Sequence, residues 1–465
     1  MSDGKAVRQQ SAAIAELSND WPLLSALCGG TRAMRAGGTQ FLPKFPAEEQ
    51  DGYDAKLKTA VLTNFFGRTV SVMASKPFSQ EINVADMSAD LQAICDDVDG
   101  QGTELQSFGE RLLRGCLSHG LAGVAVDYPA GEPARTRAEE KANHLRPYWS
   151  LYPAPTILGV KAERIGGEWV TKQVRLLETV TELDGRFGEK QIEQVRVMEP
   201  GLWEVWRKAA DRDEWLVHAQ GITSINYVPF QMFYGVQTGF GCGISPLLDL
   251  AYLNAEHWQS SADQQNILHI ARVPILFGKG ITGAIKIGGQ NAVLTDDTAA
   301  DLKFVEHTGA AIEAGRTSLL DLEDRMRQSG AELLVKRRAN VTATQVVSEG
   351  DANKCILQSI IETFEDGLNT CLGYTARWLG DTAVGEVELF KDFGVDTLSD
   401  ASAALLLDAA IAGKISDQTF FEEMRRRTVI DYDREWETEQ TQLKAQPPLV
   451  APPAPALPVH PGKPD

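Results

Sequence analysis

The sequence predicts an α+β protein, because helical and strand patterns occupy separate stretches of the chain. Helical periodicity of about 3.6 residues dominates before residue 120 and after residue 245, whereas a period of two dominates residues 146–233. Such segregation is typical of folds that combine helices with an antiparallel sheet. With 465 residues, of which 43% are hydrophobic, the chain is long enough for two or three domains with cores of their own.

The N-terminal elements are expected to be mainly helices. Ser11–Ala36 has a helical pattern with a break at Trp21-Pro22, and Tyr53–Met73 is amphipathic. Thr103 and Gln106 have the spacing of a capping box that opens a helix ending at His119. Ala122–Asp127 then follows as a buried strand.

Residues 146–233 are predicted to form antiparallel strands. Short β-rich runs alternate there with turns such as Asp184-Gly185. The apolar side chains of Trp203, Val205 and Trp215 are expected in the core of this region.

A long helix is predicted over Pro246–Ala271. Ser245 is a suitable N-cap, Pro246 suits a first helical position, and Pro274 is the next stop signal. Residues 254–266 are almost entirely polar, with Trp258 and small alanines as the apolar anchors. A helix that is polar nearly all round bridges solvent or packs against copies of itself. A long surface helix is the simpler alternative.

Further helical patterns follow a short β insert at Val273–Glu306. A second charged helix is predicted over Ala311–Ser329, with Gly330 at its C-terminal cap, and a third over Thr344–Leu379. Three shorter patterns follow, namely Ser399–Ala412, Asp417–Arg427 and Asp431–Leu443. Repeated prolines from Pro447 onward predict a solvated, extended tail.

Composition restricts the partners. The net charge of −19 means that the average surface repels DNA and anionic membranes, so a nucleic-acid role requires local basic patches or enclosure. Six scattered cysteines without a Cys-x-x-Cys pair suit a reducing compartment. No signal peptide or membrane-span pattern is present, so we expect a soluble protein made in a cytoplasm.

Motifs for catalysis, cofactors and metals do not fit. The Asp97 loop places Phe108 where a calcium loop needs a carboxylate, and no histidines have ligand spacing. Gly239–Gly243 precedes a helix as a dinucleotide loop does, but its third glycine comes one position early, which favours a hinge. We therefore expect no catalytic residue, cofactor or metal ligand. A nucleotide-binding α/β enzyme using Gly239–Gly243 stays as an alternative.

One basic cluster interrupts the acidic background. Lys336, Arg337 and Arg338 lie between the second and third long helices. They are interpreted either as a solvated strand end or as a loop that meets phosphates without recognising bases.

The order of these parts resembles the portal proteins of tailed bacteriophages, in the variety often found in prophages. The resemblance spans about residues 15–440 and depends on the order and spacing of several short stretches. These stretches are Phe41–Pro43, Asp99–Thr103, Gly123–Pro129, Arg146–Tyr148, Ser245–Asn254, Ser260–Asp263, Gly330–Leu334 and Thr342–Ala343.

The resemblance implies a portal fold with named parts. Residues 1–245 would be the wing, and residues 246–331 two stem helices flanking a small β clip at about 273–310. Residues 332–398 would hold a tunnel loop, at Lys336–Thr342, and a long helix. Residues 399–443 would be the helical crown, and residues 444–465 a disordered proline-rich tail.

The function implied is that of a structural protein and not an enzyme. Portal proteins form a ring, usually a dodecamer, at one capsid vertex of the virion, after assembly in the host cytoplasm. Double-stranded DNA passes through the ring without sequence recognition during packaging and ejection. The implied partners are terminase, major capsid and scaffolding proteins, and head–tail adaptor or tail proteins, with no membrane.

The resemblance also implies roles for particular residues. Lys336, Arg337 and Arg338 would face DNA in the tunnel loop. The stem residues Trp258, Asp263, Gln264 and Arg325 would pack between subunits. A head–tail adaptor or minor capsid protein is a further alternative, although such proteins are usually shorter and lack two long helices around a clip-like insert.

Overall fold

The computed structural model describes most of the chain, and its contacts divide the chain into two units. The described residues are 3–129, 139, 143, 145–210, 212–272, 275–280, 299–305, 310–335, 354–381, 384–391, 414, 416, 418, 421, 434 and 436–445. The first unit is Met1–Val395 and the second is Asp396–Asp465. In the second unit, helix α15 spans Trp436–Ala445 and overlaps the last of the three short helices predicted there.

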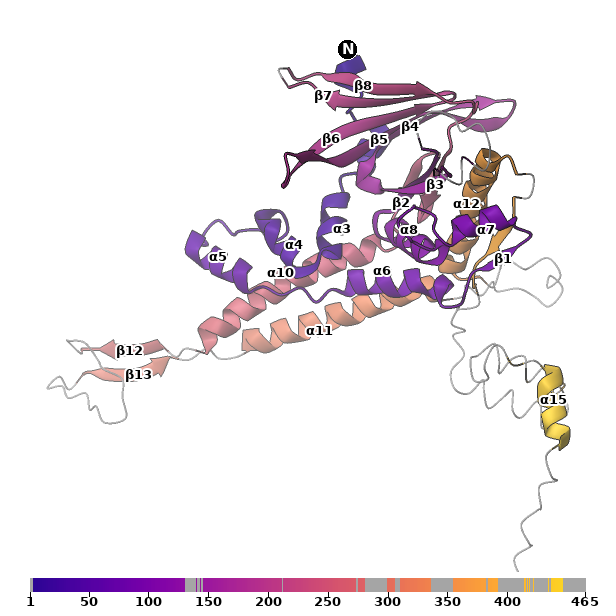
Figure 1. Ribbon diagram of the computed structural model, residues 1–465. Coiled ribbons are helices and arrows are strands. Elements are labelled where there is room, and N and C mark those ends of the chain that lie inside the picture. Colours follow the sequence, from indigo (N-terminus) through magenta and orange to yellow (C-terminus); the bar gives the residue numbers. More distant parts are fainter. Residues whose placement is uncertain are drawn as a thin grey trace, which may run out of the picture. The chain divides into compact units, whose positions relative to one another are not determined.

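Helices and a mainly antiparallel set of strands make up the first unit (Figure 1), so the predicted α+β class is confirmed. The segment predicted as one broken helix before residue 36 forms three helices. The helices before the first long strand are α1 Asp3–Ala6, α2 Ala12–Leu17, α3 Trp21–Cys28, α4 Gly30–Ala36, α5 Gln50–Thr59, α6 Phe65–Ser75, α7 Ala89–Cys95 and α8 Leu105–His119, with short 3-10 turns η1 Gly38–Gln40 and η2 Lys76–Phe78.

Capping residues explain several of these boundaries. Ser11 and Ser88 accept hydrogen bonds from amides in the first turns of α2 and α7. Helix α8 is capped by Glu104 and not by the predicted Thr103, and the side chain of Gln106 instead donates to the Phe78 carbonyl. Gly120 ends α8 in the left-handed conformation that glycine adopts most readily.

A three-stranded sheet lies at the centre of the first unit. Its middle strand is β2 (Leu121–Asp127), which pairs antiparallel with β3 (Tyr148–Pro153) and β9 (Phe230–Tyr234). Strand β2 is buried along almost its entire length, which explains its continuous apolar sequence.

The rest of the predicted β region forms a second sheet. Its five strands are antiparallel, and each pairs with the next one along the chain, as the period-two pattern and its turns predict. The strands are β4 Ile157–Ile165, β5 Glu168–Asp184, β6 Gly188–Glu199, β7 Leu202–Lys208 and β8 Trp215–Ile222, with the short turn η3 Ala154–Thr156 before them. Val205 and Trp215 are buried as expected, whereas Trp203 is half-buried.

Helix α12 (Ile356–Leu379) packs one apolar side against the central sheet. Phe364 is buried and lies 5.1 Å, centroid to centroid, from the ring of Phe233 on β9. The indole of Trp149 donates a 2.8 Å hydrogen bond to the Thr375 hydroxyl. Each large apolar side chain buried here contributes about 1.5–3 kcal/mol, so the sheet and α12 form one core.

The predicted start of α12 at Thr344 is wrong, because Cys355 just before the helix has an extended backbone. Cys355 is the N-cap, and its amide donates to the side chain of Gln358 at 2.8 Å. Residues 344–353 of the prediction lie outside the described part of the chain. The described start is therefore twelve positions later than expected.

Two further long helices lie side by side in Figure 1, α10 (Leu248–Ala271) and α11 (Ala310–Ala331). Between them in sequence, β12 (Ile275–Lys279) and β13 (Asp301–Val305) form a two-stranded antiparallel sheet. Helix α10 ends where predicted but begins at Leu248, after a turn in which the Ser245 hydroxyl accepts from the Leu247 amide. Pro246 therefore precedes the helix instead of opening it.

Gly330 was predicted to cap α11, but it lies within that helix. A Cβ there would come within 3.2 Å of the Thr69 hydroxyl on α6, and it would also approach Leu250 on α10. The glycine thus allows three helices to pack closely. After α11 come the turn η4 (Glu332–Leu334) and, beyond α12, strand β14 (Glu386–Glu388), which pairs with β1 (Asn83–Ala85).

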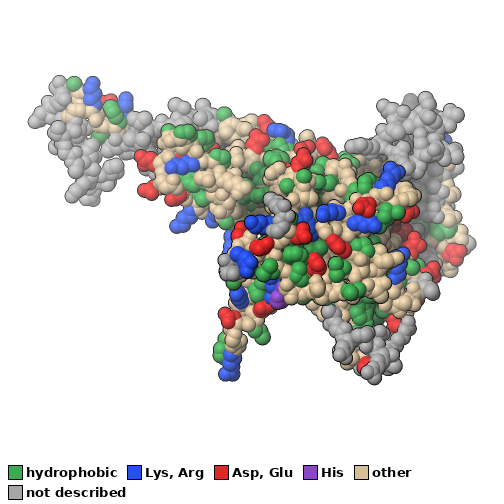
Figure 2. Space-filling model, turned by 90° about the horizontal axis from the view of Figure 1, so that it is seen from above, with side chains coloured by type: hydrophobic (Ala, Val, Ile, Leu, Met, Phe, Trp, Pro, Cys, Tyr) green, Lys and Arg blue, Asp and Glu red, His purple; other side chains and the backbone are tan. Residues whose placement is uncertain are grey.

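The hydropathy of the helices and the charge of the surface restrict the class of protein. No helix in the described ranges is long and apolar enough to cross a bilayer. Figure 2 shows that Lys and Arg side chains are interspersed with Asp and Glu on the face it presents. That face therefore carries mixed charge instead of a broad basic surface.

Candidate functional site on the paired long helices

Helices α10 and α11 run antiparallel and are joined by polar contacts. The Gln264 side chain on α10 donates a 2.8 Å hydrogen bond to the Ile312 carbonyl near the start of α11. Toward the other end, Nε2 of His257 lies 3.5 Å from Oε1 of Glu323. Gly315 faces the Gln264 amide so closely that a Cβ would come within 2.2 Å of its oxygen. A side chain at position 315 would thus displace the bridging amide.

Asn254 on α10 is completely buried and caps another helix. Its Oδ1 accepts from the Phe66 amide at 3.0 Å, and its Nδ2 donates to the Thr63 carbonyl at 2.9 Å. The first amides of α6 have no partner within their own helix. Asn64, the N-cap of α6, accepts from the next of them, the Gly67 amide. The polar side chain of Asn254 therefore fixes α10 against the start of α6.

A buried lysine joins α5 to α10. The side chain of Lys56 is only 2% exposed, and its ammonium group lies 2.9 Å from Glu48 and 3.2 Å from Asp263. The rings of Phe45 and Tyr53 also lie within cation–π distance of it. This arrangement neutralises an amine that burial would otherwise disfavour in its charged form.

The two pKa shifts at this cluster reflect the same pairing. Burial acts to lower the pKa of Lys56, but hydrogen bonds to Glu48 and Asp263 outweigh it and raise the pKa above 10.5. Burial likewise acts to raise the pKa of Glu48, but the Lys56 ammonium and the Phe45 amide lower it below 4.5. Both groups are therefore charged at neutral pH.

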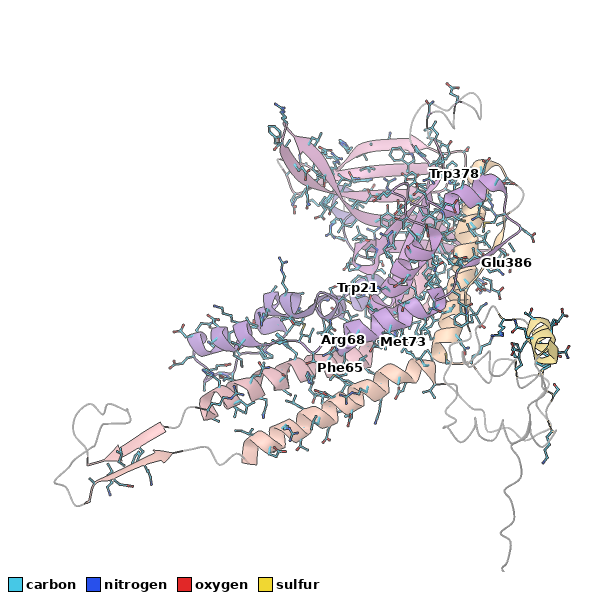
Figure 3. The ribbon with its side chains drawn as sticks, turned by 60° about the horizontal axis from the view of Figure 1, so that its bottom comes forward. Trp21, Phe65, Arg68, Met73, Trp378 and Glu386 are labelled. Carbon is cyan, nitrogen blue, oxygen red and sulfur yellow. The ribbon has the colours of Figure 1, made fainter. Side chains whose placement is uncertain are left out.

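His257 and Trp258 are buried next to each other on α10. The rings of His257 and Phe65 on α6 form a T-shaped pair, with 6.4 Å between their centroids. Burial lowers the pKa of His257 below 6.5, and the nearby Glu323 opposes this shift only in part. Among the described residues, Nδ1 of His257 and Nε1 of Trp258 have no hydrogen-bond partner. Figure 3, which labels Phe65, Arg68 and Met73 on α6, shows that helix lying along the α10/α11 pair.

These positions change the interpretation of the polar helix. The middle of α10 was expected to face solvent or a neighbouring copy, but Asn254, His257 and Gln264 point into the chain. Trp258, predicted to pack between subunits, is fully buried within one chain, and its role between subunits stays a prediction. Gln264 and Asp263 are also engaged inside the chain, by α11 and α5.

The remaining predicted residues lie on α11 or outside the described part of the chain. Arg325 is exposed on α11, where its role between subunits stays a prediction. Lys336, Arg337 and Arg338 lie outside the described residues, as do most of the predicted crown and the tail beyond Ala445. The exposed side of the α10/α11 pair also carries apolar side chains, with Ile267 37% and Leu320 47% exposed. That side is the part of the pair available to another molecule.

The glycine run at 239–243 forms a hairpin turn and neither a hinge nor a phosphate loop. Strands β10 (Val236–Gly239) and β11 (Cys242–Ile244) pair antiparallel around it. Gly241 has a φ of 69°, and its amide donates to the Tyr234 hydroxyl. The nucleotide-binding alternative thus loses the loop-to-helix geometry on which it depends.

The aspartate loop before α8 is closed by arginines. Asp97 pairs with Arg146 and Asp99 pairs with Arg111, while their other oxygens accept from backbone amides of the loop. In the part of the chain that the structure describes, no group of three metal-ligating side chains occurs.

The buried polar contacts of Asn254, Lys56 and His257 were not found from the sequence. The partners of Asn254 are backbone groups 188 and 191 residues away, and Lys56 meets Asp263 across 207 residues. No local pattern encodes such pairings. In the sequence alone, nothing distinguishes the buried Lys56 from lysines on the surface.

Fold and site define an α+β protein built around an antiparallel helix pair with a two-stranded sheet between its helices. Residues 246–379, which include this pair and α12, match a domain of unknown function, DUF4055. No curated protein matches the chain.

Three solved structures are similar to the chain over most of its length. A chain from the virion of a native gene transfer agent particle has a TM-score of 0.38 and 14% identity, with 84% of this chain and 97% of that chain covered. A chain from the neck of an empty particle, computed with C6 symmetry, has a TM-score of 0.38, 14% identity and coverages of 85% and 97%. A chain from the neck of a native particle, computed with C12 symmetry, has a TM-score of 0.37, 13% identity and coverages of 84% and 97%.

Proposed function

We propose that this chain is a phage portal protein, the repeated subunit of a ring at one capsid vertex through which DNA is packaged and ejected. One observation carries the proposal. The α10/α11 pair is antiparallel and encloses a small two-stranded sheet in sequence, in the place where the resemblance to portal proteins puts the stem and clip. In this proposal the ring is a dodecamer in the virion and docks terminase, capsid and scaffolding proteins, and adaptor or tail proteins.

The charge of the chain suits passage of DNA without adhesion. Many Lys and Arg contacts to phosphates release counterions and bind DNA strongly at low salt. A chain with a net charge of −19 avoids that binding over most of its surface. The exposed charges of α11 are partly paired with each other, as in Arg316 with Glu313 and Arg327 with Asp324. A channel wall of this kind repels phosphate weakly and lets the duplex slide.

The ring is tested by the mass of the purified particle. We expect native mass spectrometry in physiological salt to give about twelve copies of the 50.8 kDa chain, and negative-stain images to show a central hole. A particle of one or two copies at every concentration tested contradicts the ring. A head–tail adaptor or minor capsid role would then be the next interpretation to examine.

The basic cluster provides a second test. Replacing Lys336, Arg337 and Arg338 together with alanine is expected to leave ring mass unchanged and to reduce the DNA retained in particles, because these side chains would supply weak contacts to phosphate. The matched control replaces three exposed basic residues of the five-stranded sheet and its β5–β6 turn, Arg164, Arg186 and Lys190. Equal packaging and DNA retention in the cluster variant and the wild type would remove the proposed role.

A further inference from the structure

An aromatic groove lies between the two sheets and α12, away from the paired long helices. It has a volume of about 440 Å³. Two stacked aromatic pairs line it, Trp169 with Phe240 at 5.6 Å between ring centroids and Tyr227 with Tyr374 at 5.2 Å. Trp169 is 59% exposed and Phe240 is 40% exposed. Large aromatic faces are thus open to another molecule.

The groove also offers polar groups to a ligand backbone. The exposed Trp169 carries an indole N–H donor. The exposed carboxylate of Asp366 on α12 lies at the groove. Aromatic faces combined with the indole donor suit a ligand with an apolar ridge and unpaired carbonyl groups. A polyproline II helix is such a ligand, because it has no internal hydrogen bonds.

The sequence of this chain contains a segment with that chemistry. Prolines recur at every third position in its last residues. They are Pro452, Pro455, Pro458, Pro461 and Pro464. A polyproline II helix has three residues per turn, so prolines with this spacing fall on one ridge. The segment also contains a lysine, Lys463, which could pair with the carboxylate of Asp366.

We propose that the groove binds the proline segment 452–464 of a neighbouring copy of this chain. The choice of a neighbouring copy rests on the proposed ring. The groove and the segment belong to different units of the chain, and a closed homo-oligomer brings one segment per groove at a high local concentration. Exchange of segments between neighbours would link adjacent subunits outside the α10/α11 pair.

The chemistry of the groove is tested by peptide titration. A fluorescein-labelled peptide of residues 450–465 is titrated with the full chain in which Pro455, Pro458 and Pro461 are replaced by alanine, so that its own segment does not compete. We expect saturable binding, weakened about tenfold by Trp169→Ala, since stacking on one exposed aromatic side chain contributes on this scale. Phe187→Ala is the matched control, because Phe187 is an 87% exposed aromatic residue outside the groove.

A second peptide tests the spacing. In it Pro455 exchanges places with Ala456, and Pro458 with Leu457, so composition is kept and the period of three is lost. We expect this peptide to bind at least tenfold more weakly. Equal binding of the two peptides, or no effect of Trp169→Ala on either, overturns the proposal.

A cross-link tests which copy supplies the segment. Val459 is replaced by p-benzoylphenylalanine in the full chain, which is irradiated and then separated under denaturing conditions. The expected product contains two chains joined at residues of the groove. A product joined within one chain, or joined elsewhere, contradicts segment exchange.

The experiments distinguish an error in the proposed groove site from an error in the proposed ring. A particle of about twelve copies that does not bind the peptide overturns only the groove. A monomer that binds the peptide with the expected dependence on Trp169 overturns the ring and, with it, the exchange between neighbours.

Discussion

Replacing Asn254 with alanine is expected to lower the free energy of unfolding of the first unit by about 3 kcal/mol, because the buried Phe66 amide loses its partner and the Thr63 carbonyl loses one of its two hydrogen bonds. The Phe66 amide and the Thr63 carbonyl both bind the Asn254 side chain, which is completely buried. Leaving the Phe66 amide unpaired costs about 1–3 kcal/mol, and losing one hydrogen bond to the Thr63 carbonyl, which still accepts from the Phe65 amide, costs about 0.5–1.5 kcal/mol. Urea unfolding followed by circular dichroism measures the change.

Asn266→Ala is the matched control for this experiment, because Asn266 is an exposed asparagine on the same helix. We expect it to change stability by less than about 0.5 kcal/mol. Equal losses in the two variants would show that the contacts of Asn254 contribute nothing specific.

Removing both acids around Lys56 is expected to be almost as damaging. The double variant Glu48→Gln, Asp263→Asn keeps the size of both side chains but leaves an ammonium group that is 2% exposed without a countercharge. An uncompensated buried charge costs about 3 kcal/mol in stability. Adding Lys56→Met should recover most of the loss, since an apolar side chain needs no countercharge. No recovery in the triple variant would assign the loss to something other than the buried charge.

The pH dependence of this cluster has a definite sign. The lowered pKa of Glu48 gives stability that is present above 4.5 and is lost as the pH falls through the folded-state value. The raised pKa of Lys56 gives stability that is present below 10.5 and is lost as the pH rises through its folded-state value. The difference in unfolding free energy between wild type and the double variant should therefore be largest between pH 4.5 and 10.5. It should narrow outside that window.

Periodicity predicted the elements whose partners are apolar or nearby in sequence. The antiparallel strands of residues 146–233 alternate, so their pairing follows from neighbouring hairpins. In α12 the buried residues Ile360, Phe364 and Leu368 recur at every fourth position, a spacing that is typical of one buried helix face. Its start was placed too early, although Gly350, Asp351 and Asn353, which disfavour helices, could have indicated the break.

The burial of α10 could not be predicted in the same way. Asn254, His257 and Gln264 count as polar in any periodic pattern, so the helix resembled one that faces water. Each becomes a buried residue only because a group from a remote element pairs with it or packs around it. The function proposed from the helix pair depends instead on the order of whole elements. Wrong predictions of burial at single residues do not change that order.

The uneven burial of α10 has a mechanical consequence. Among the positions of α10 whose burial is described, Gln264 is the last buried one, and the positions from Gln265 to Ile267 are exposed. The N-terminal part of α10 is held by contacts with α5 and α6. The C-terminal part packs mainly against α11 and precedes the β12–β13 sheet. A sideways load on that sheet therefore acts through a lever whose fulcrum lies near Asp263. The load reaches the body of the subunit as torque on the Asn254 and Lys56 contacts.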